Sequence, residues 1–150
     1  MITRRRILLA DDHALVRAGI RALLEGLPGI VVVGETGDGL EAVEFVRRDP
    51  PDAILLDITL PSLNGLEAAA RIARLDVPTR VLMLSMHASA EYAARAFAVG
   101  AAGYLNKDSA FDELATALEE ICAGRRYLCR AIDAQQVLQF ERRASTGESE

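Results

Sequence analysis

The sequence lacks tryptophan and has only two cysteines, Cys122 and Cys129. Their spacing matches neither a Cys-x-x-Cys motif nor a zinc-binding pattern, so we expect reduced thiols in a reducing compartment and no disulfide scaffold. Long apolar runs are also missing near the N-terminus, where the run 7–10 ends at Asp11 and Asp12. Because that run is too short for a signal-peptide core or a membrane span, we expect a cytoplasmic protein without a membrane partner.

Basic residues are fewer than acidic residues in this sequence. Lys and Arg number 17 against 22 Asp and Glu, and the formal net charge is −5. Affinity for nucleic acids in general comes mainly from basic side chains that neutralise phosphates, so this balance argues against DNA binding by this segment itself. Hydrophobic residues make up 51%, which is enough to fill a core and argues against disorder of the whole chain.

Short apolar runs alternate with amphipathic stretches along most of the chain. The apolar runs are typical of buried strands, and the amphipathic stretches have helical spacing. We expect strands over 7–10, 30–34, 53–56, 80–84 and 102–105, and helices over 14–24, 40–48, 65–75, 90–99 and 111–123. Strict alternation of this kind predicts an α/β fold, a doubly wound parallel sheet of five strands with helices on both faces.

The character of the sequence changes after Tyr127. We assign 5–124 to the main domain and 125–150 to a linker. Apolar positions within 131–143 are compatible with one extra helix. The small and polar residues of 144–150 are typical of a linker or a disordered tail.

Polar residues stand where the predicted strands end. Ligands of open parallel sheets bind at the carboxyl ends of the strands, so these residues are candidates for a site. They are Asp11 and Asp12 after the first strand, Asp57 after the third, Ser85 after the fourth and Lys107 after the fifth. Each alone has a structural explanation: an Asp pair favours a helix start, and a lone Asp, Ser or Lys is commonly a solvated loop residue.

Taken together, the five residues favour a site for a phosphoryl group. Three neighbouring carboxylates repel one another unless a cation compensates their charge. Hard oxygen ligands suit Mg²⁺, which uses one or two carboxylates together with phosphate oxygens and water. Lys107 adds a mobile positive charge that can pair with a carboxylate or a phosphoryl oxygen.

These residues resemble those of a known family. Asp11-Asp12, the run from Leu55 to Pro61 followed by Gly65, and Gly103-Tyr104-Leu105-Asn106-Lys107 are similar to the receiver domain of two-component response regulators. The resemblance covers about residues 5–124 and its joint spacing is highly specific. It implies a flavodoxin-like sheet with the strand order 2-1-3-4-5.

The resemblance implies a phosphoacceptor and a metal site. Asp57 would accept a phosphoryl group from a phosphohistidine of a sensor histidine kinase. Mg²⁺ would be the cofactor, held by Asp11, Asp12, Asp57 and the backbone carbonyl of Thr59. Such a domain is not an enzyme acting on other molecules, but it assists its own phosphorylation and dephosphorylation.

The resemblance also implies a switch that responds to the phosphoryl group. Lys107 would contact the acyl phosphate, and Ser85 would supply a hydroxyl that follows it. Tyr104 would be the aromatic residue whose rotamer accompanies activation. Pro61 and Gly65 would shape the loop after the phosphoacceptor.

Further details resemble the NarL/FixJ class of response regulators. Ser85 replaces the commoner threonine, Asp108 follows Lys107 where many receivers have proline, and Gly124-Arg125-Arg126-Tyr127-Leu128 follows the last predicted helix. Members of that class carry a helix-turn-helix domain after a linker. The resemblance therefore implies a homodimer on phosphorylation, and control of transcription through a C-terminal DNA-binding domain that lies outside this sequence.

Other functions fit the sequence less well. A phosphatase of the haloacid-dehalogenase type needs a second Asp two residues after the nucleophile, but Thr59 stands there. A flavin-binding electron carrier needs a phosphate loop after the first strand, where Asp11 and Asp12 would repel the phosphate. A degenerate receiver that acts only as an interaction module is disfavoured by the intact set of five residues.

Both histidines have plain interpretations. His13 is interpreted as a surface or helix-start residue rather than a metal ligand, because Mg²⁺ prefers oxygen. His87, two residues after Ser85, is at least as well explained as an exposed loop residue as by a role beside the phosphate.

Overall fold

A parallel sheet runs through the centre of the molecule, which the computed structural model describes over residues 4–146. Within that range all strand pairs are parallel and the order is β2-β1-β3-β4-β5-β6. The strands are β1 (Arg5–Ala10), β2 (Ile30–Thr36), β3 (Ala53–Asp57), β4 (Arg80–Ser85), β5 (Gly103–Asn106) and β6 (Tyr127–Leu128).

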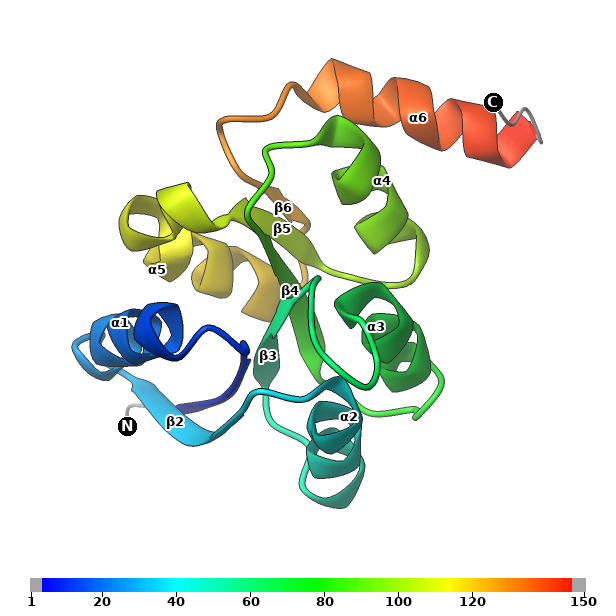
Figure 1. Ribbon diagram of the computed structural model, residues 1–150. Helices are drawn as coiled ribbons and strands as arrows, with labels where there is room; N and C mark the ends of the chain where they lie inside the picture. The colour runs from blue at the N-terminus through cyan, green and yellow to red at the C-terminus, as the bar shows by residue number, and fades with distance from the viewer. Residues whose placement is uncertain (1–3, 147–150) are drawn as a thin grey trace.

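Helices cover both faces of this sheet. Figure 1 shows α1 (Ala14–Glu25) and α5 (Ala110–Cys122) on one face, with α2 (Gly39–Arg48), α3 (Gly65–Ala73) and α4 (Ala90–Ala98) on the other. Because both faces are covered, β3 is buried along its whole length and so is β4 beyond Arg80, which explains their continuous apolar sequences. No helix within 4–146 has the length and apolarity that crossing a bilayer requires.

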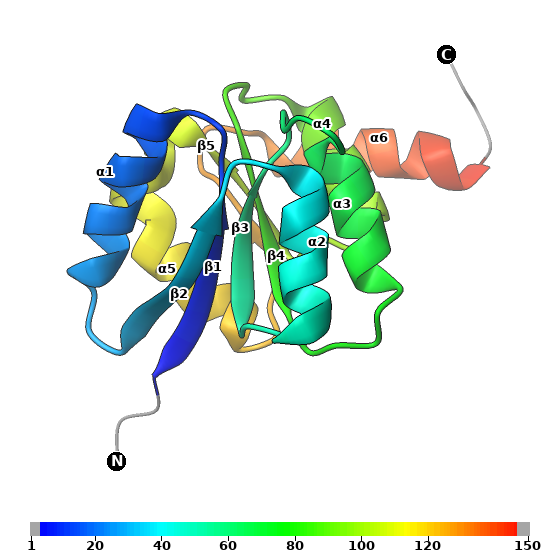
Figure 2. The same ribbon diagram turned by 60° about the horizontal axis from the view of Figure 1, so that its bottom comes forward.

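The predicted fold class and strand order are confirmed, and the sheet has one strand more than predicted. The short strand β6 extends the sheet beyond β5, with Tyr127 opposite Gly103 and Leu128 opposite Tyr104. A strand of two residues carries no periodic signal, so the sequence pattern did not indicate it. The parallel arrangement brings the carboxyl ends of the strands to one edge, at the top of Figure 2.

The residues after β6 include the predicted extra helix, which lies further toward the C-terminus than predicted. The helix α6 spans Ala134–Thr146 rather than 131–143. It begins there because the Asp133 side chain accepts a hydrogen bond of 2.9 Å from the Gln135 amide, as a helix-capping residue does. The predicted linker residues 147–150 lie outside the described range.

The helix α6 packs against α4, as both ribbon views show (Figures 1 and 2). Val137 faces inward and is only 3% exposed. The guanidinium of Arg126 lies 3.7 Å from the centre of the Phe97 ring on α4 and pairs with Glu141 of α6 at 2.5 Å. These contacts hold α6 on the α4 side of the domain.

A buried carboxylate connects α5 to β6 and to the segment that follows β6. Glu113 is only 4% exposed, and its Oε1 accepts hydrogen bonds from the Tyr127 hydroxyl at 2.6 Å and the Arg130 amide at 3.1 Å. Burial, followed by the bond to Glu113, raises the pKa of Tyr127 to about 12. The pair therefore anchors the C-terminal segment to the domain.

Tyr127→Phe should lower the free energy of unfolding at neutral pH by about 1–3 kcal/mol, because Glu113 loses one of its buried hydrogen bonds. The folded pKa of Tyr127 lies above its ordinary value of 10, so this contribution is complete below pH 10 and lost as pH rises toward about 12. Urea unfolding at several pH values measures both effects. If the difference in free energy of unfolding between wild type and variant stays constant from pH 7 to pH 12, the expected dependence on the ionisation of Tyr127 is contradicted.

Candidate functional site

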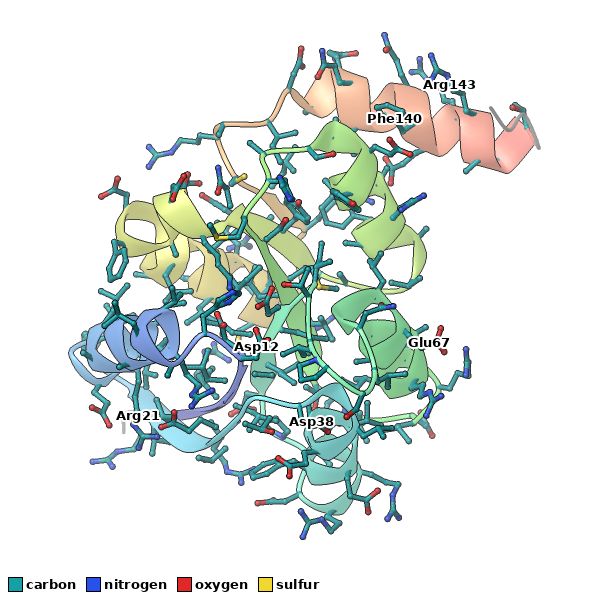
Figure 3. The ribbon with its side chains drawn as sticks, viewed as in Figure 1. Asp12, Arg21, Asp38, Glu67, Phe140 and Arg143 are labelled. Carbon is teal, nitrogen blue, oxygen red and sulfur yellow. The ribbon has the colours of Figure 1, made fainter. Side chains whose placement is uncertain are left out.

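The carboxyl edge of the sheet gathers the polar residues predicted from the sequence. Asp11 follows β1, Asp57 ends β3, Ser85 ends β4 and Lys107 follows β5. All four are buried, with exposed fractions of 0%, 1%, 3% and 6%, whereas Asp12 is exposed. Asp12 is labelled in Figure 3, in the loop between β1 and α1. Parallel pairing of the strands brings together residues that are far apart in the sequence.

Lys107 lies between two buried carboxylates. Its Nζ is 2.8 Å from Oδ2 of Asp11 and 2.9 Å from Oδ2 of Asp57. Burial by itself would lower the pKa of Lys107, but the two carboxylates outweigh it and the pKa is raised. Lys107 is also the only lysine in the sequence. Its compact ammonium supplies a point charge, which the flat guanidinium of arginine does not.

Asp57 is held at both carboxylate oxygens. Oδ1 accepts from the Thr59 amide at 3.1 Å and the Thr59 hydroxyl at 3.3 Å, while Oδ2 accepts from Lys107. Burial raises the pKa of Asp57 above its ordinary value, and the bond from Lys107 acts in the opposite direction. The structure thus defines contacts of the Thr59 amide and hydroxyl, while the role of its carbonyl as a ligand stays a prediction.

The acidic edge suits a divalent cation. Asp11, Asp12, His13 and Asp57 each offer a ligand atom, and these atoms lie within 4.8 Å of one another. Oδ2 of Asp11 is buried and has the ammonium of Lys107 as its charge partner at 2.8 Å, although this contact lacks hydrogen-bond geometry. One ammonium leaves the three carboxylates with excess negative charge, which a divalent cation would compensate. Three carboxylates form the hard oxygen donor set that Mg²⁺ prefers.

Ser85 and Tyr104 are connected through the peptide groups of His87. The His87 amide donates to Oγ of Ser85 at 3.0 Å, and the Tyr104 hydroxyl donates to the His87 carbonyl at 2.8 Å. Tyr104 is fully buried, which raises the pKa of its hydroxyl. A displacement of Ser85 would thus reach Tyr104 through the loop before α4.

Arg17 supports the site, although the sequence pattern does not indicate this role. Arg17 on α1 donates to the Asp11 carbonyl at 2.5 Å, and its Nε donates to Glu35 at 2.9 Å. Arg17 therefore holds the backbone that carries the two acidic residues. Its position on the first turns of α1, close after the Asp pair, is the only signal that the sequence carries for this contact.

The residue after Lys107 departs from the common receiver pattern, as the sequence indicated. The Asp108 amide donates at 3.2 Å to the side chain of Asn106, which caps the short helix η1 (Lys107–Ser109) that leads into α5. Proline at this position would have no amide to donate. The loop therefore uses a hydrogen bond where a proline ring would fix the backbone.

Comparison with known proteins identifies similar chains. Residues 7–119 match the family described as response regulator receiver domain. The response regulator UvrY of Escherichia coli strain K12 is 42% identical over 132 residues, which are 88% of this chain and 61% of UvrY. The chain thus spans less than two thirds of the length of that relative.

Solved structures agree with the sequence match. A two-component response regulator of the LuxR family from Aurantimonas sp. SI85-9A1 is 42% identical, with a TM-score of 0.84 over 91% of this chain and 97% of the other. The signal receiver domain described as that of NarL from Mycobacterium tuberculosis is 36% identical, with a TM-score of 0.78 over 82% and 99%. These matches confirm the resemblance to receiver domains of the NarL/FixJ class.

Gly65 keeps the loop after Asp57 close to β3. Its amide donates to the Ile58 carbonyl at 2.7 Å, and a Cβ added at Gly65 would stand 2.1 Å from the Asp57 carbonyl oxygen. Such a separation is far inside van der Waals contact, and the obstacle is backbone rather than a flexible side chain. Glycine is therefore required for this approach.

Gly65→Ala should displace the loop that carries Thr59 and lower the free energy of unfolding by at least about 1–3 kcal/mol, the usual cost of overpacking. Gly26→Ala is the matched control, since its nearest neighbours would lie at 3.5 Å and its φ is −83°. Chemical denaturation measures both variants. Equal stability of the two would contradict the assigned role of Gly65.

Proposed function

This chain belongs to the response regulator receiver domain family, and we propose from this membership and the geometry of its acidic edge that Asp57 accepts the phosphoryl group. Receiver domains are the phosphoacceptors of two-component signal transduction. The observation that carries the assignment is the position of Asp57 at the end of β3, buried, paired with the only lysine and next to Asp11. No other carboxylate in the described residues combines these features.

The proposed reaction is a transfer from a phosphohistidine of a sensor histidine kinase. A carboxylate oxygen of Asp57 forms a bond to phosphorus while the bond between phosphorus and the imidazole nitrogen of the donor breaks. The nitrogen keeps the electron pair of that bond, and the product on this chain is an acyl phosphate. Thr59 holds Oδ1 of Asp57 at 3.1 Å, which leaves little freedom in the orientation of the carboxylate.

Mg²⁺ is the proposed cofactor, held by Asp11, Asp12, Asp57 and the carbonyl of Thr59. When bound, it supplies charge compensation for the phosphoryl oxygens. Asp11 fits this role because it offers a carboxylate oxygen within 4.8 Å of those of Asp12 and Asp57. Asp12 is exposed and gives the site access to solvent.

Lys107 is proposed to bind the acyl phosphate once it has formed. Its ammonium is already 2.9 Å from Oδ2 of Asp57, so new phosphoryl oxygens would arise within its reach. Ser85 ends the neighbouring strand and supplies a hydroxyl for the same group. Movement of Ser85 would then change the hydrogen bonds through His87 to Tyr104, and with them the position of α4.

The wider role follows from the family. We propose that the domain assists its own phosphorylation and dephosphorylation in the cytoplasm, forms a homodimer when phosphorylated, and controls transcription through a DNA-binding domain outside this sequence. Residues 5–124 are the proposed receiver unit and 125–150 the proposed linker, which contains β6 and α6.

Asp57→Asn should abolish labelling by a small-molecule phosphodonor in the presence of Mg²⁺, because the amide oxygen is a poor nucleophile. Wild type should take up one phosphate per chain, stable in acid and removed by hydroxylamine, as expected of an acyl phosphate. Intact-mass spectrometry measures the incorporation.

The control for this experiment is Asp76→Asn, which changes an exposed aspartate with a φ of 57° that asparagine tolerates. It should label like wild type. Undiminished labelling of the Asp57→Asn variant would overturn the assignment of the phosphoacceptor.

Lys107→Ala should leave Mg²⁺ binding intact, but phosphorylation of the variant should no longer change the surface at α4. Without the ammonium, Asp11 and Asp57 lose their counter-charge. In the presence of a chelator, the free energy of unfolding should therefore fall by up to about 3–5 kcal/mol. Mg²⁺ should restore part of that loss. Amide NMR should show shifts in α4 when wild type is phosphorylated and none in the variant; equal shifts in both would contradict the role of Lys107.

A further inference from the structure

The second half of the helix α6 extends past the rest of the domain. In its first half Val137 and Phe140 pack against the core, whereas residues 142–146 are all exposed. Figures 1 and 2 both show this second half reaching beyond α4. A helix of 13 residues is stabilised mainly by packing rather than by propensity. The end of α6 therefore offers a surface that a partner can cover.

A groove lies between this end of α6 and the outer face of α4. Its volume is about 540 Å³. Apolar side chains of both helices line it, Ala94 and Ala98 from α4 together with Phe140 and Ala144 from α6. The three alanines leave a shallow surface, while Phe140 is a large, half-buried ring. One patch thus carries both a ring that can project into a partner and a surface that can receive such a ring.

Charged side chains of both signs accompany these apolar residues. Glu91 and Arg95 of α4 line the groove, and so do Glu141 and Arg143 of α6. Figure 3 labels Phe140 and Arg143 as neighbours on α6, and the guanidinium carbon of Arg143 lies 5.3 Å from the centre of the Phe140 ring. The two glutamates would repel a nucleic acid. Any partner with a single sign of charge would likewise be repelled by half of these groups.

Two identical copies are the partners that such a patch suits. About a two-fold axis the same patch meets itself, so that each residue contacts a different residue of the other copy. A patch that pairs with itself must therefore contain positive and negative groups. The groove meets this condition across its two helices, with Glu91 on α4 and Arg143 on α6.

We propose that two copies of this chain pair through the groove between α4 and α6, with Arg143 of one protomer against Glu91 of its partner and the converse contact on the other side of the axis. In this arrangement the exposed end of α6 lies on α4 of the second copy. The inference rests on the homodimer of the proposed function and adds to it the surface through which the copies meet.

Phosphorylation can act on this surface because α4 forms one wall of the groove. The peptide groups of His87 bond to Ser85 and Tyr104 in the loop before α4, where the proposed switch would act. A shift of α4 changes its spacing from α6, and with it the fit of the second copy. Pairing should therefore be tighter in the phosphorylated chain than in the unmodified one.

The test reverses the two charges separately and then combines the variants. Arg143→Glu and Glu91→Arg each place like charges on both sides of the two-fold axis. An equimolar mixture of the two variants restores opposite charges on both sides. Arg142→Glu is the matched control, because it makes the same change on the same helix at an exposed position that does not line the groove.

The measurement is sedimentation velocity at several protein concentrations, which gives Kd of pairing. All chains are treated with a small-molecule phosphodonor and Mg²⁺, and intact-mass spectrometry checks that each is labelled. Circular dichroism checks that the variants keep their helices.

Labelled wild type should pair, and each single charge reversal should weaken pairing by at least about tenfold, because like charges then face each other in the contact. The mixture should return to within about threefold of the wild-type Kd, and Arg142→Glu should stay within the same limit.

Single charge reversals that pair as tightly as wild type, or a mixture that pairs as weakly as the single variants, would refute the inference. The phosphoacceptor and a homodimer through another face would then stand. Wild type that takes up no phosphate would instead be a failure of the proposed phosphoacceptor. Labelled wild type that stays monomeric would contradict the homodimer of the proposed function and the inference with it.

Discussion

The buried ion pairs between Lys107 and the carboxylates of Asp11 and Asp57 are the constraint on which the rest of the structure depends. Two buried carboxylates without a cation would be strongly destabilising, because a buried charge must be paired. Lys107 reaches them because β5 is parallel to β1 and β3 in one sheet, so that all three strands end at the same carboxyl edge. The sheet order is therefore a requirement of the site as well as of the core.

The same arrangement explains why this edge can respond to a ligand. Lys107 neutralises the cluster only in part, since three carboxylates and one ammonium leave negative charge over. A divalent cation and a phosphoryl group can each enter such a site and change which groups are paired. The hydrogen bonds that join Ser85 through His87 to Tyr104 lie in the loop before α4, where the proposed switch would act.

The helix α6 packs against α4. The ion pair between Arg126 and Glu141 and the buried side chain of Val137 hold α6 in this position. The C-terminal segment is attached also at Glu113, through the Tyr127 hydroxyl. The described part of the C-terminal segment is thus packed on the domain, and a movement of α4 would displace the helix α6 that rests on it. Figure 3 shows Phe140 on α6, the helix that would receive such a movement.

The sequence by itself determined the fold class, the strand order through its family resemblance, and the five residues at the carboxyl edge. It could do so because buried strands read as apolar runs and because strand ends in parallel sheets share one edge. The tertiary structure alone decided the contacts that local pattern does not encode: the strand β6, the start of α6 at Ala134, the hold of Arg17 on Asp11, and the turn of the His13 ring toward the carboxylates. Those contacts join side chains to groups on other elements, and their geometry exists only after the helices have packed on the sheet.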